Sequence, residues 1–186
     1  MGEALRPELR EIERDEIERL WSIDRAEVID AIYSCEKGEL TLRPERHDVT
    51  GWPAGEPEEY GPLLLDCVDQ GGTAYGAFVG ATLIGAAVLE SRFIGPARDQ
   101  LQLKFLHVSQ RHRGAGLGVV LFDRAVARAC ELGARQLYIS ATPSENTVGF
   151  YLHRGCRVAG SLDPALFELE PKDIHLEFDL PAPTLE

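Results

Sequence analysis

Three glycines alternate with other residues where the sequence changes from a strand-like pattern to a helical one. They are Gly114, Gly116 and Gly118, and Arg111 and Arg113 come just before them. Glycine allows a ligand to approach the backbone closely, and the first turn of a helix presents unpaired N–H groups and a partial positive charge. This combination predicts a site for a phosphate or pyrophosphate group, with the arginines adding positive charge.

Three phosphate-binding motifs could account for these glycines. A Walker loop needs a lysine and then a serine or threonine after its last glycine, whereas Leu117 and Gly118 follow Gly116. A GxGxxG fingerprint would need a glycine where Val119 stands, and the next predicted strand, QLYISAT, ends without an acid to bind a ribose. The third pattern, Q/R-x-x-G-x-G, is matched fully by the segment from Arg111 to Gly116.

In this segment the sequence resembles the GNAT superfamily of acyl-CoA-dependent N-acetyltransferases. LHVSQRHRGAGLG is similar to the strand and pyrophosphate turn of that family, and FYLHRGC stands where the family has FYxxxGF. The resemblance implies that acetyl-CoA is the co-substrate and that backbone groups of Leu106 and Val108 pair with its pantetheine arm. A backbone N–H near His107 or Val108 would polarise the thioester. The pyrophosphate would lie on the backbone of Arg113, Gly114, Ala115, Gly116, Leu117 and Gly118.

The segment ATPSENTVGFY departs from the family pattern, which often reads Asn-x-x-Ala-x-x-Phe-Tyr. Counting back from Phe150 and Tyr151 puts Thr147 at the alanine position and Ser144 at the asparagine position. Ser144 is able to donate one hydrogen bond to the cofactor. It is equally suited to be the N-cap of the following helix, and both roles can hold together.

Acetyl transfer to an amine needs a neutral amine, a donor for the developing oxyanion and a proton for the leaving thiolate. Tyr151 matches the usual proton donor of the family, although such a tyrosine can also be a core residue with a wet hydroxyl. The predicted strand 101–108 contains no carboxylate, so Glu90 on the preceding strand is the candidate base, acting through a water. His107 titrates in the right range, but a lone histidine among core residues is more often structural.

Other segments must position these residues. The patterns predict strands at 9–12, on both sides of a turn near Gly80, at 101–108, at 135–142 and at 174–180. They predict helices around Ile17 to Trp21 and at 24–32, 60–72, 116–132 and 147–154, with a long loop or flap from Thr41 to Pro62. This order is typical of a mixed α/β (α+β) sheet flanked by helices. The resemblance implies a GNAT fold, in which the central strands splay apart around the cofactor.

Length and composition limit the remaining choices. The 186 residues suit one domain, 1–186, with acceptor-side helices and a loop in 1–70 and the acetyl-CoA-binding core in 71–160. A net charge of -12 disfavours nucleic acid as a partner, and no apolar run is long enough to span a membrane. Four scattered cysteines and the absence of a signal-peptide pattern favour a cytoplasmic protein without a metal site. The sequence leaves open whether the protein forms a homodimer.

Charge is divided unevenly along the chain. Residues 1–70 hold 8 lysines and arginines against 19 acids, a net of -11, whereas residues 92–157 hold 10 against 4, a net of +6. This division favours an anion site in the second part and a cation site in the first, although a solvated surface explains it as well. We therefore expect acetyl transfer to a primary amine of a small cationic molecule. A protein N-terminus or lysine as acceptor, and a non-catalytic acyl-CoA sensor, are the alternatives.

Overall fold

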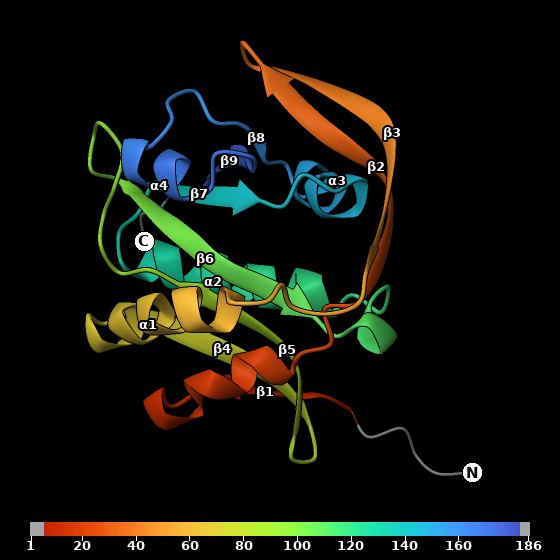
Figure 1. The fold of residues 1–186 in the computed structure, drawn as a ribbon. Helices are drawn as coiled ribbons and strands as arrows, with labels where there is room; N and C mark the ends of the chain where they lie inside the picture. The colour runs from red at the N-terminus through yellow and green to blue at the C-terminus, as the bar shows by residue number, and fades with distance from the viewer. Residues whose placement is uncertain (1–5, 183–186) are drawn as a thin grey trace.

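The computed structural model describes residues 6–182, so the outermost residues of the predicted domain lie outside it. Its main feature is a seven-stranded sheet in the order β1-β4-β5-β6-β7-β9-β8 (Figure 1). The neighbouring strands are antiparallel except for β6 and β7, which confirms the predicted mixed sheet. The strands are β1 (Glu8–Glu11), β4 (Thr73–Val79), β5 (Thr82–Leu89), β6 (Gln100–Val108), β7 (Gln136–Ala141), β8 (Arg157–Val158) and β9 (Ile174–Asp179).

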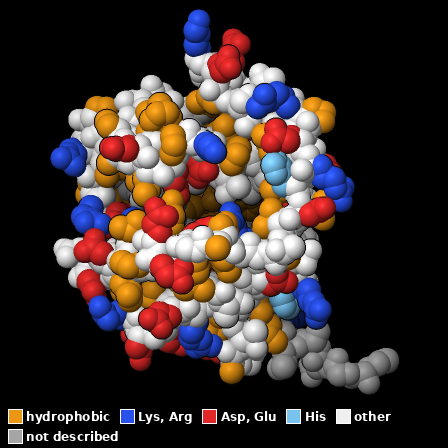
Figure 2. Space-filling view, in the orientation of Figure 1, with side chains coloured by type: hydrophobic (Ala, Val, Ile, Leu, Met, Phe, Trp, Pro, Cys, Tyr) orange, Lys and Arg blue, Asp and Glu red, His pale blue; other side chains and the backbone are white. Residues whose placement is uncertain are grey.

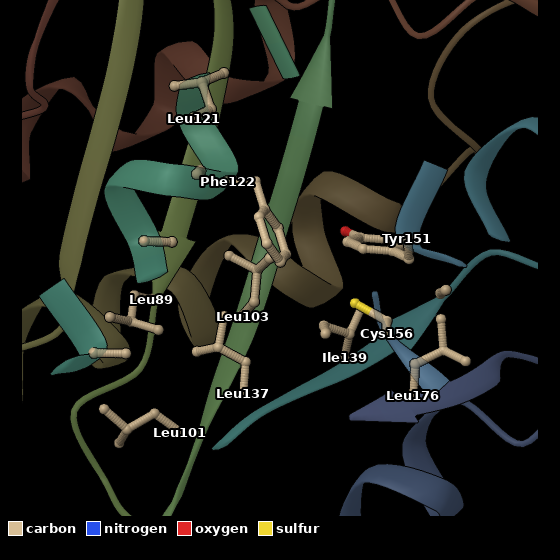
Figure 3. Packing of buried hydrophobic residues seen from close by; sticks show 14 of the residues in the cluster. Leu89, Leu101, Leu103, Leu121, Phe122, Leu137, Ile139, Tyr151, Cys156 and Leu176 are labelled. Carbon is tan, nitrogen blue, oxygen red and sulfur yellow. The ribbon is translucent and has the colours of Figure 1, made fainter. Parts of the chain in front are cut away.

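Helices cover both faces of this sheet. On one face α2 (Leu117–Glu131) and α3 (Glu145–His153) join a core in which Phe122 packs with Leu103 and Ile139 (Figure 3). On the other face the 3-10 helix η1 (Arg14–Ser22) and α1 (Glu56–Asp69) enclose a second core around Phe105. Because the sheet is buried on both faces, β5 is a continuous buried apolar run rather than an alternating one.

β6 and β7 begin side by side and then separate. They pair in parallel only from Gln100 with Gln136 to Gln102 with Tyr138. Beyond that point β6 continues to Val108 and β7 to Ala141, and Figure 1 shows the two strands diverging. The splayed central strands that the resemblance implies are thus confirmed, and they leave backbone groups of β6 without a strand partner.

The segment between η1 and α1 corrects two predictions. It forms a separate antiparallel hairpin of β2 (Glu27–Glu36) and β3 (Glu39–Val49), where a helix at 24–32 and a loop from Thr41 had been expected. A bulge between Ile29 and Ala31 interrupts the alternation of β2, so its apolar spacing resembles that of a helix. β3 is exposed along most of its length, so its sequence is polar like that of a loop. The predicted loop also ends early, because α1 begins at Glu56.

The base of this hairpin lies over the separated ends of β6 and β7. Tyr33 N donates to the carbonyl of Pro143 at 2.7 Å, and Ile32 forms an isolated bridge with Ser144 at the start of α3. The far end projects beyond the sheet (Figure 1). The hairpin therefore adds one wall to the gap between the two strands.

Two short helices complete the fold. They are η2 (Gln110–His112) in the glycine turn and α4 (Pro164–Leu169), which our pattern analysis missed. Asp163 caps α4 by accepting from Ala165 N and Leu166 N, and Pro164 occupies the first helical position. This Asp-Pro pair is a recognised start signal for a helix. Across residues 6–182, no helix is long and apolar enough to cross a membrane.

Candidate active site

A cleft of about 870 Å³ opens between the separated ends of β6 and β7. Figure 2 shows this face of the molecule with a hollow near its centre. The walls come from the end of β6, the glycine turn, the first turn of α2, the α3 helix and the base of β2. Its volume lies within the range of small-molecule and cofactor sites.

The last residues of β6 present backbone donors to this cleft. Ser109 N donates to the carbonyl of Ile84 in β5 at 2.8 Å. Since peptide groups alternate in direction along a strand, the N–H groups of Leu106 and Val108 face the opposite way, into the gap. Both residues line the cleft, and they are the two positions at which the resemblance implies pantetheine pairing.

The glycine turn presents a second set of donors. Gly114 and Gly116 have φ values of 78° and 82°, and a Cβ atom at either position would meet nothing within 4 Å. Glycine is thus required by the left-handed backbone and not by crowding. Gly116 is the N-cap of α2 and no side chain caps this helix, whose first bond runs from Val120 N to Gly116 O. The N–H groups of Leu117, Gly118 and Val119 therefore have no partner within the helix.

The two arginines of the turn differ in their surroundings. Arg113 lines the cleft, and its guanidinium donates to the carbonyls of Val108 at 2.8 Å and Ala26 at 3.2 Å. It also lies 3.9 Å from the carboxylate of Glu27, so part of its charge is balanced by the base of β2. Arg111 is exposed and does not line the cleft.

Tyr151, which belongs to α3, lines the cleft. Its side chain is only 5% exposed, and its hydroxyl makes no hydrogen bond to any residue in the described range. In Figure 3 this hydroxyl points toward β6. Burial, aided by Cys156 and Asp173, raises the pKa of Tyr151 well above its usual value. The phenol therefore remains protonated at neutral pH, which is the form a proton donor requires.

Ser144 is the N-cap of α3. Its hydroxyl accepts from Thr147 N at 3.1 Å and donates to Thr147 Oγ1 at 2.9 Å. It is 1% exposed and is not part of the cleft lining, whereas Thr142, Asn146 and Thr147 are. Of the two roles that the sequence left open for Ser144, the geometry favours the cap.

Glu90 lies outside the cleft lining, at the end of β5. It accepts from Arg92 at 2.9 Å and from Ser91 N at 3.0 Å, and Lys104 lies 3.8 Å away. Burial acts to raise its pKa, but these partners outweigh burial and the net pKa is lowered. An ion-paired carboxylate of low pKa is a poor base, so this geometry favours a structural role for Glu90.

His107 lines the cleft but its ring is enclosed by aromatic side chains. The ring centroids of Trp52 and Phe105 lie 4.8 Å and 4.7 Å from it. Burial, with the charges of Arg25 and Arg113, lowers the pKa of His107 to about 3. A ring with so low a pKa binds a proton weakly at physiological pH and is a poor base, which agrees with the structural interpretation.

Pattern analysis missed the cleft residues that come from the N-terminal hairpin and the α3 start. Arg25, Glu27 and Ile29 belong to the stretch read as a helix, and Pro53 belongs to the predicted loop. Asn146 stands two residues after the asparagine position of the family pattern, so that pattern does not select it. It lines the cleft and donates to Glu27 at 2.9 Å. No local signal marks these residues, because they meet only when the hairpin packs on α3.

A mixed sheet that splits around a cleft, with a glycine turn opening a helix at its mouth, is the architecture of an acyl-CoA-dependent transferase. The model of the family "Acetyltransferase (GNAT) family" matches residues 29–156. This match covers more than half of the chain, and the chain therefore belongs to the GNAT acetyltransferase family. Membership makes the protein an acetyltransferase and acetyl-CoA its co-substrate.

Solved structures share this fold over nearly the whole chain. Nourseothricin acetyltransferase is 19% identical with a TM-score of 0.67, covering 94% of this chain and 99% of its own. PaiA N-acetyltransferase from Thermoplasma acidophilum, in complex with coenzyme A, is 19% identical with a TM-score of 0.62, covering 93% and 98%. IAA acetyltransferase from Bacillus cereus is 18% identical with a TM-score of 0.56, covering 94% and 99%. A comparison with curated protein sequences found no match.

Proposed function

We propose that this protein transfers the acetyl group of acetyl-CoA to a primary amine of a small cationic molecule, with Tyr151 as the acid. The observation that carries the proposal is the hydroxyl of Tyr151, which bonds to no residue of the described range and belongs to a residue that lines the same cleft as the free N–H groups of β6. A leaving thiolate in the cleft would give this hydroxyl its partner.

The hydrogen-bond donors in the cofactor half of the cleft suit a CoA ester. The N–H groups of Leu106 and Val108 suit an extended amide-containing arm, because they can pair as a neighbouring strand would. Those of the turn, including Gly116 and Gly118, suit a pyrophosphate at the positive end of α2. Arg113 supplies charge and also holds the turn against Val108. Most residues predicted to bind the cofactor line this cleft: Leu106, His107, Val108, Arg113, Gly114, Gly116 and Gly118. The others are not part of its lining: Arg111, Ala115, Leu117 and Ser144.

Bound acetyl-CoA supplies the activated acetyl group, and the chain supplies orientation and protons. An N–H donor near His107 or Val108 stabilises negative charge on the carbonyl oxygen as the amine attacks. Tyr151 then protonates the sulfur, since its raised pKa keeps the proton available at neutral pH. Neither Glu90 nor His107 is placed or poised to take the amine proton, so the base must come from another part of the cleft.

The acceptor approaches the cleft from its N-terminal side in this proposal. Glu27 lines the cleft there, and Glu56 forms a 3.1 Å ion pair with Arg25, which also lines it. The net negative charge of residues 1–70, from which this side of the cleft is built, favours an ammonium-bearing acceptor. A cytoplasmic location is part of the proposal, supported by the free state of all the cysteines: Cys35, Cys67, Cys130 and Cys156.

The test is acetyl-CoA-dependent thiol release with a panel of amines. The panel should hold small cationic amines, neutral amines, and peptides with a free N-terminus or lysine. We expect thiol release well above the amine-free rate with small cationic amines. Release with peptides alone would support the protein-acceptor alternative, and CoA binding without release by any amine would identify a sensor.

A further inference from the structure

We infer that Glu27 limits the affinity of the cleft for CoA, because its carboxylate competes with the pyrophosphate group for the charge of Arg113. This inference rests on the proposed function, in which the pyrophosphate lies on the glycine turn. It makes Glu27 a positioning residue that acts through Arg113. Removal of this acid should therefore strengthen cofactor binding, which is the opposite of what damage to the fold would do.

Glu27 is the acid that lies in the cleft itself. Of the described residues that line the cleft, it is the only one with a carboxylate, and its side chain is 18% exposed. Arg25 and Arg113 are the arginines of the same lining, and Arg25 already has Glu56 as a partner at 3.1 Å. Since CoA is an anion, its phosphate groups are attracted by Arg113 and repelled by Glu27.

Glu27 balances the charge of Arg113 without a hydrogen bond. Its Oε2 lies 3.9 Å from Nη1 of Arg113, which is too long for a hydrogen bond and leaves charge attraction alone. Within residues 6–182, Glu27 is the only carboxylate that forms an ion pair with this arginine. The hydrogen bonds of Arg113 go to backbone carbonyls, including those of Val108 and Ala26, which hold the guanidinium but do not neutralise it.

Arg113 can take a phosphate group without leaving its place. A guanidinium has five N–H groups. Arg113 uses one on each of its three nitrogens for the carbonyls of Val108, Ala26 and Asp24, at 2.8, 3.2 and 3.5 Å. The second N–H of each terminal nitrogen suits a phosphate oxygen. The pyrophosphate and the carboxylate of Glu27 thus meet the same cation.

Asn146 fixes the carboxylate of Glu27 in this position. Its Nδ2 donates to Oε1 of Glu27 at 2.9 Å, whereas the contact with Arg113 is made by Oε2. The carboxylate therefore faces α3 with one oxygen and the glycine turn with the other, and β2 runs beside α3 (Figure 1). If the carboxylate turned away from an arriving phosphate, it would lose its bond to Asn146.

The backbone around Glu27 is anchored on both sides of the cleft. On the side of the turn, Asp24 N donates to Ser109 Oγ at 3.0 Å and Gln110 N donates to Asp24 O at 3.0 Å. On the side of α3, Tyr33 N donates to the carbonyl of Pro143 at 2.7 Å. Glu27 lies between these two anchor points, so it is held next to Arg113 by the fold.

An acid in this position favours release of the product. CoA leaves the reaction with the same pyrophosphate that acetyl-CoA brings, so a site that binds one tightly also retains the other. The positive end of α2 and Arg113 both attract this group. Glu27 weakens that attraction, and differences in affinity at one site appear mostly in the dissociation rate. We therefore expect CoA to dissociate more slowly when the acid is removed.

Glu27→Gln tests the inference because it removes the charge and keeps the oxygen that accepts from Asn146. Calorimetry should show CoA binding about three- to fivefold tighter than in wild type, the scale of one partly exposed charge pair. Asp30→Asn is the matched control. Asp30 is also an acid of β2 paired with an arginine, Arg46 at 3.0 Å, but it is exposed and not part of the cleft lining.

The control should bind CoA as wild type does. Unchanged or weaker binding by Glu27→Gln would overturn the inference, and so would an equal gain in Asp30→Asn. If Glu27→Gln leaves CoA affinity unchanged and instead raises the KM of an amine acceptor, Glu27 serves the acceptor rather than the cofactor. Should Glu27→Gln not fold, Glu27→Ala removes the same charge and takes its place.

Salt and fragments of CoA separate a charge effect from a change of shape. The gain in Glu27→Gln should shrink between low salt and about 1 M, where charges are screened beyond ~3 Å. ADP contains a pyrophosphate and pantetheine contains none, so ADP should bind more tightly to the variant while pantetheine binds equally to both proteins. A gain that is independent of salt, or equal for the two fragments, would contradict competition for Arg113.

A double-mutant cycle shows whether Glu27 acts through Arg113. The gain from Glu27→Gln should be smaller in an Arg113→Ala background, because the contested charge is gone. An equal gain in both backgrounds would overturn this route. If wild type does not bind CoA, the proposed function itself fails. If wild type binds CoA and Glu27→Gln brings no gain, only the role of Glu27 fails.

Discussion

The guanidinium Nε of Arg113 donates to the carbonyl oxygen of Val108 at 2.8 Å, which joins the glycine turn to the last residue of β6. The same side chain reaches the carbonyl of Ala26 at 3.2 Å, next to the start of β2. One arginine therefore holds together the strand end, the turn and the hairpin base that surround the cleft.

Arg113→Ala should weaken CoA binding more than Arg111→Ala does. The first variant removes both the positive charge and the hydrogen bonds that hold the turn, whereas Arg111 is exposed and outside the cleft lining. We expect about a tenfold loss of affinity for Arg113→Ala, the scale of one lost charge-assisted contact. Calorimetry with CoA measures both. An equal loss for the two variants would mean that the turn is held by other contacts.

Gly116→Ala should destabilise the fold and weaken CoA binding. At φ 82° a side chain is strained by about 1–2 kcal/mol even though the space is open. Gly149→Ala is the matched control, because Gly149 is helical, has open space and has no positive φ, so alanine should stabilise it by about 0.5–1 kcal/mol. Urea unfolding gives both changes in the free energy of unfolding. Changes of the same sign would contradict the backbone argument.

Tyr151→Phe should lower kcat by ~10²-fold or more and leave CoA affinity nearly intact, because only the proton is lost. The raised pKa of Tyr151 adds a pH expectation. An acid must be protonated, so wild-type kcat should show no decline from this group up to at least pH 10, its ordinary pKa. Single-turnover kinetics separates this effect from product release. A loss below about threefold would assign the hydroxyl to structure.

Ser144→Ala distinguishes the two roles considered for this residue. As the N-cap of α3, Ser144 should contribute about 0.5–2 kcal/mol to the free energy of unfolding. CoA affinity should stay within about twofold, because its hydroxyl is already bonded to Thr147. Unfolding and calorimetry on the same sample decide this. A large affinity loss with unchanged stability would restore the cofactor role.

Glu90→Gln should alter stability rather than chemistry. The pKa of Glu90 is lowered from 4.5 in the folded state, because its partners outweigh the effect of burial. Its contribution is therefore complete above pH 4.5 and is lost as the pH falls through the lowered pKa. The variant should have a lower free energy of unfolding at pH 7 and a flatter acid profile. A loss of kcat comparable to that of Tyr151→Phe would return Glu90 to the list of bases.

Short sequence patterns were enough to locate some of the elements. The glycine spacing with Arg111 and the Phe150-Tyr151 pair was enough to place the cofactor turn and the helix behind it. The alternation of 101–108 and the period of 116–132 were enough to place β6 and α2. These signals are strong because backbone conformation and a single buried face decide them.

Only the tertiary structure shows that β2 and β3 form a hairpin. A bulged strand has apolar residues at spacings that also suit a helix, and an exposed edge strand has the composition of a loop. β2 and β3 are strands because they pair with each other and because Tyr33 bonds to Pro143 across the molecule. Such pairing energy comes from partners distant in the sequence, which no local pattern contains.

The lining of the cleft was decided in the same way. The uneven charge along the chain predicts a cation site within 1–70, and the structure shows that Glu27 is the acid of that segment that lines the cleft. Whether the pKa of a carboxylate is lowered by ion pairs, as at Glu90, or raised by burial, as at Asp173, depends on what packs around it. The sequence alone determined the family and the glycine turn, because local backbone geometry creates that turn. Only the fold decided which side chains share the cleft, because burial and charge proximity exist only after the hairpin and α3 meet.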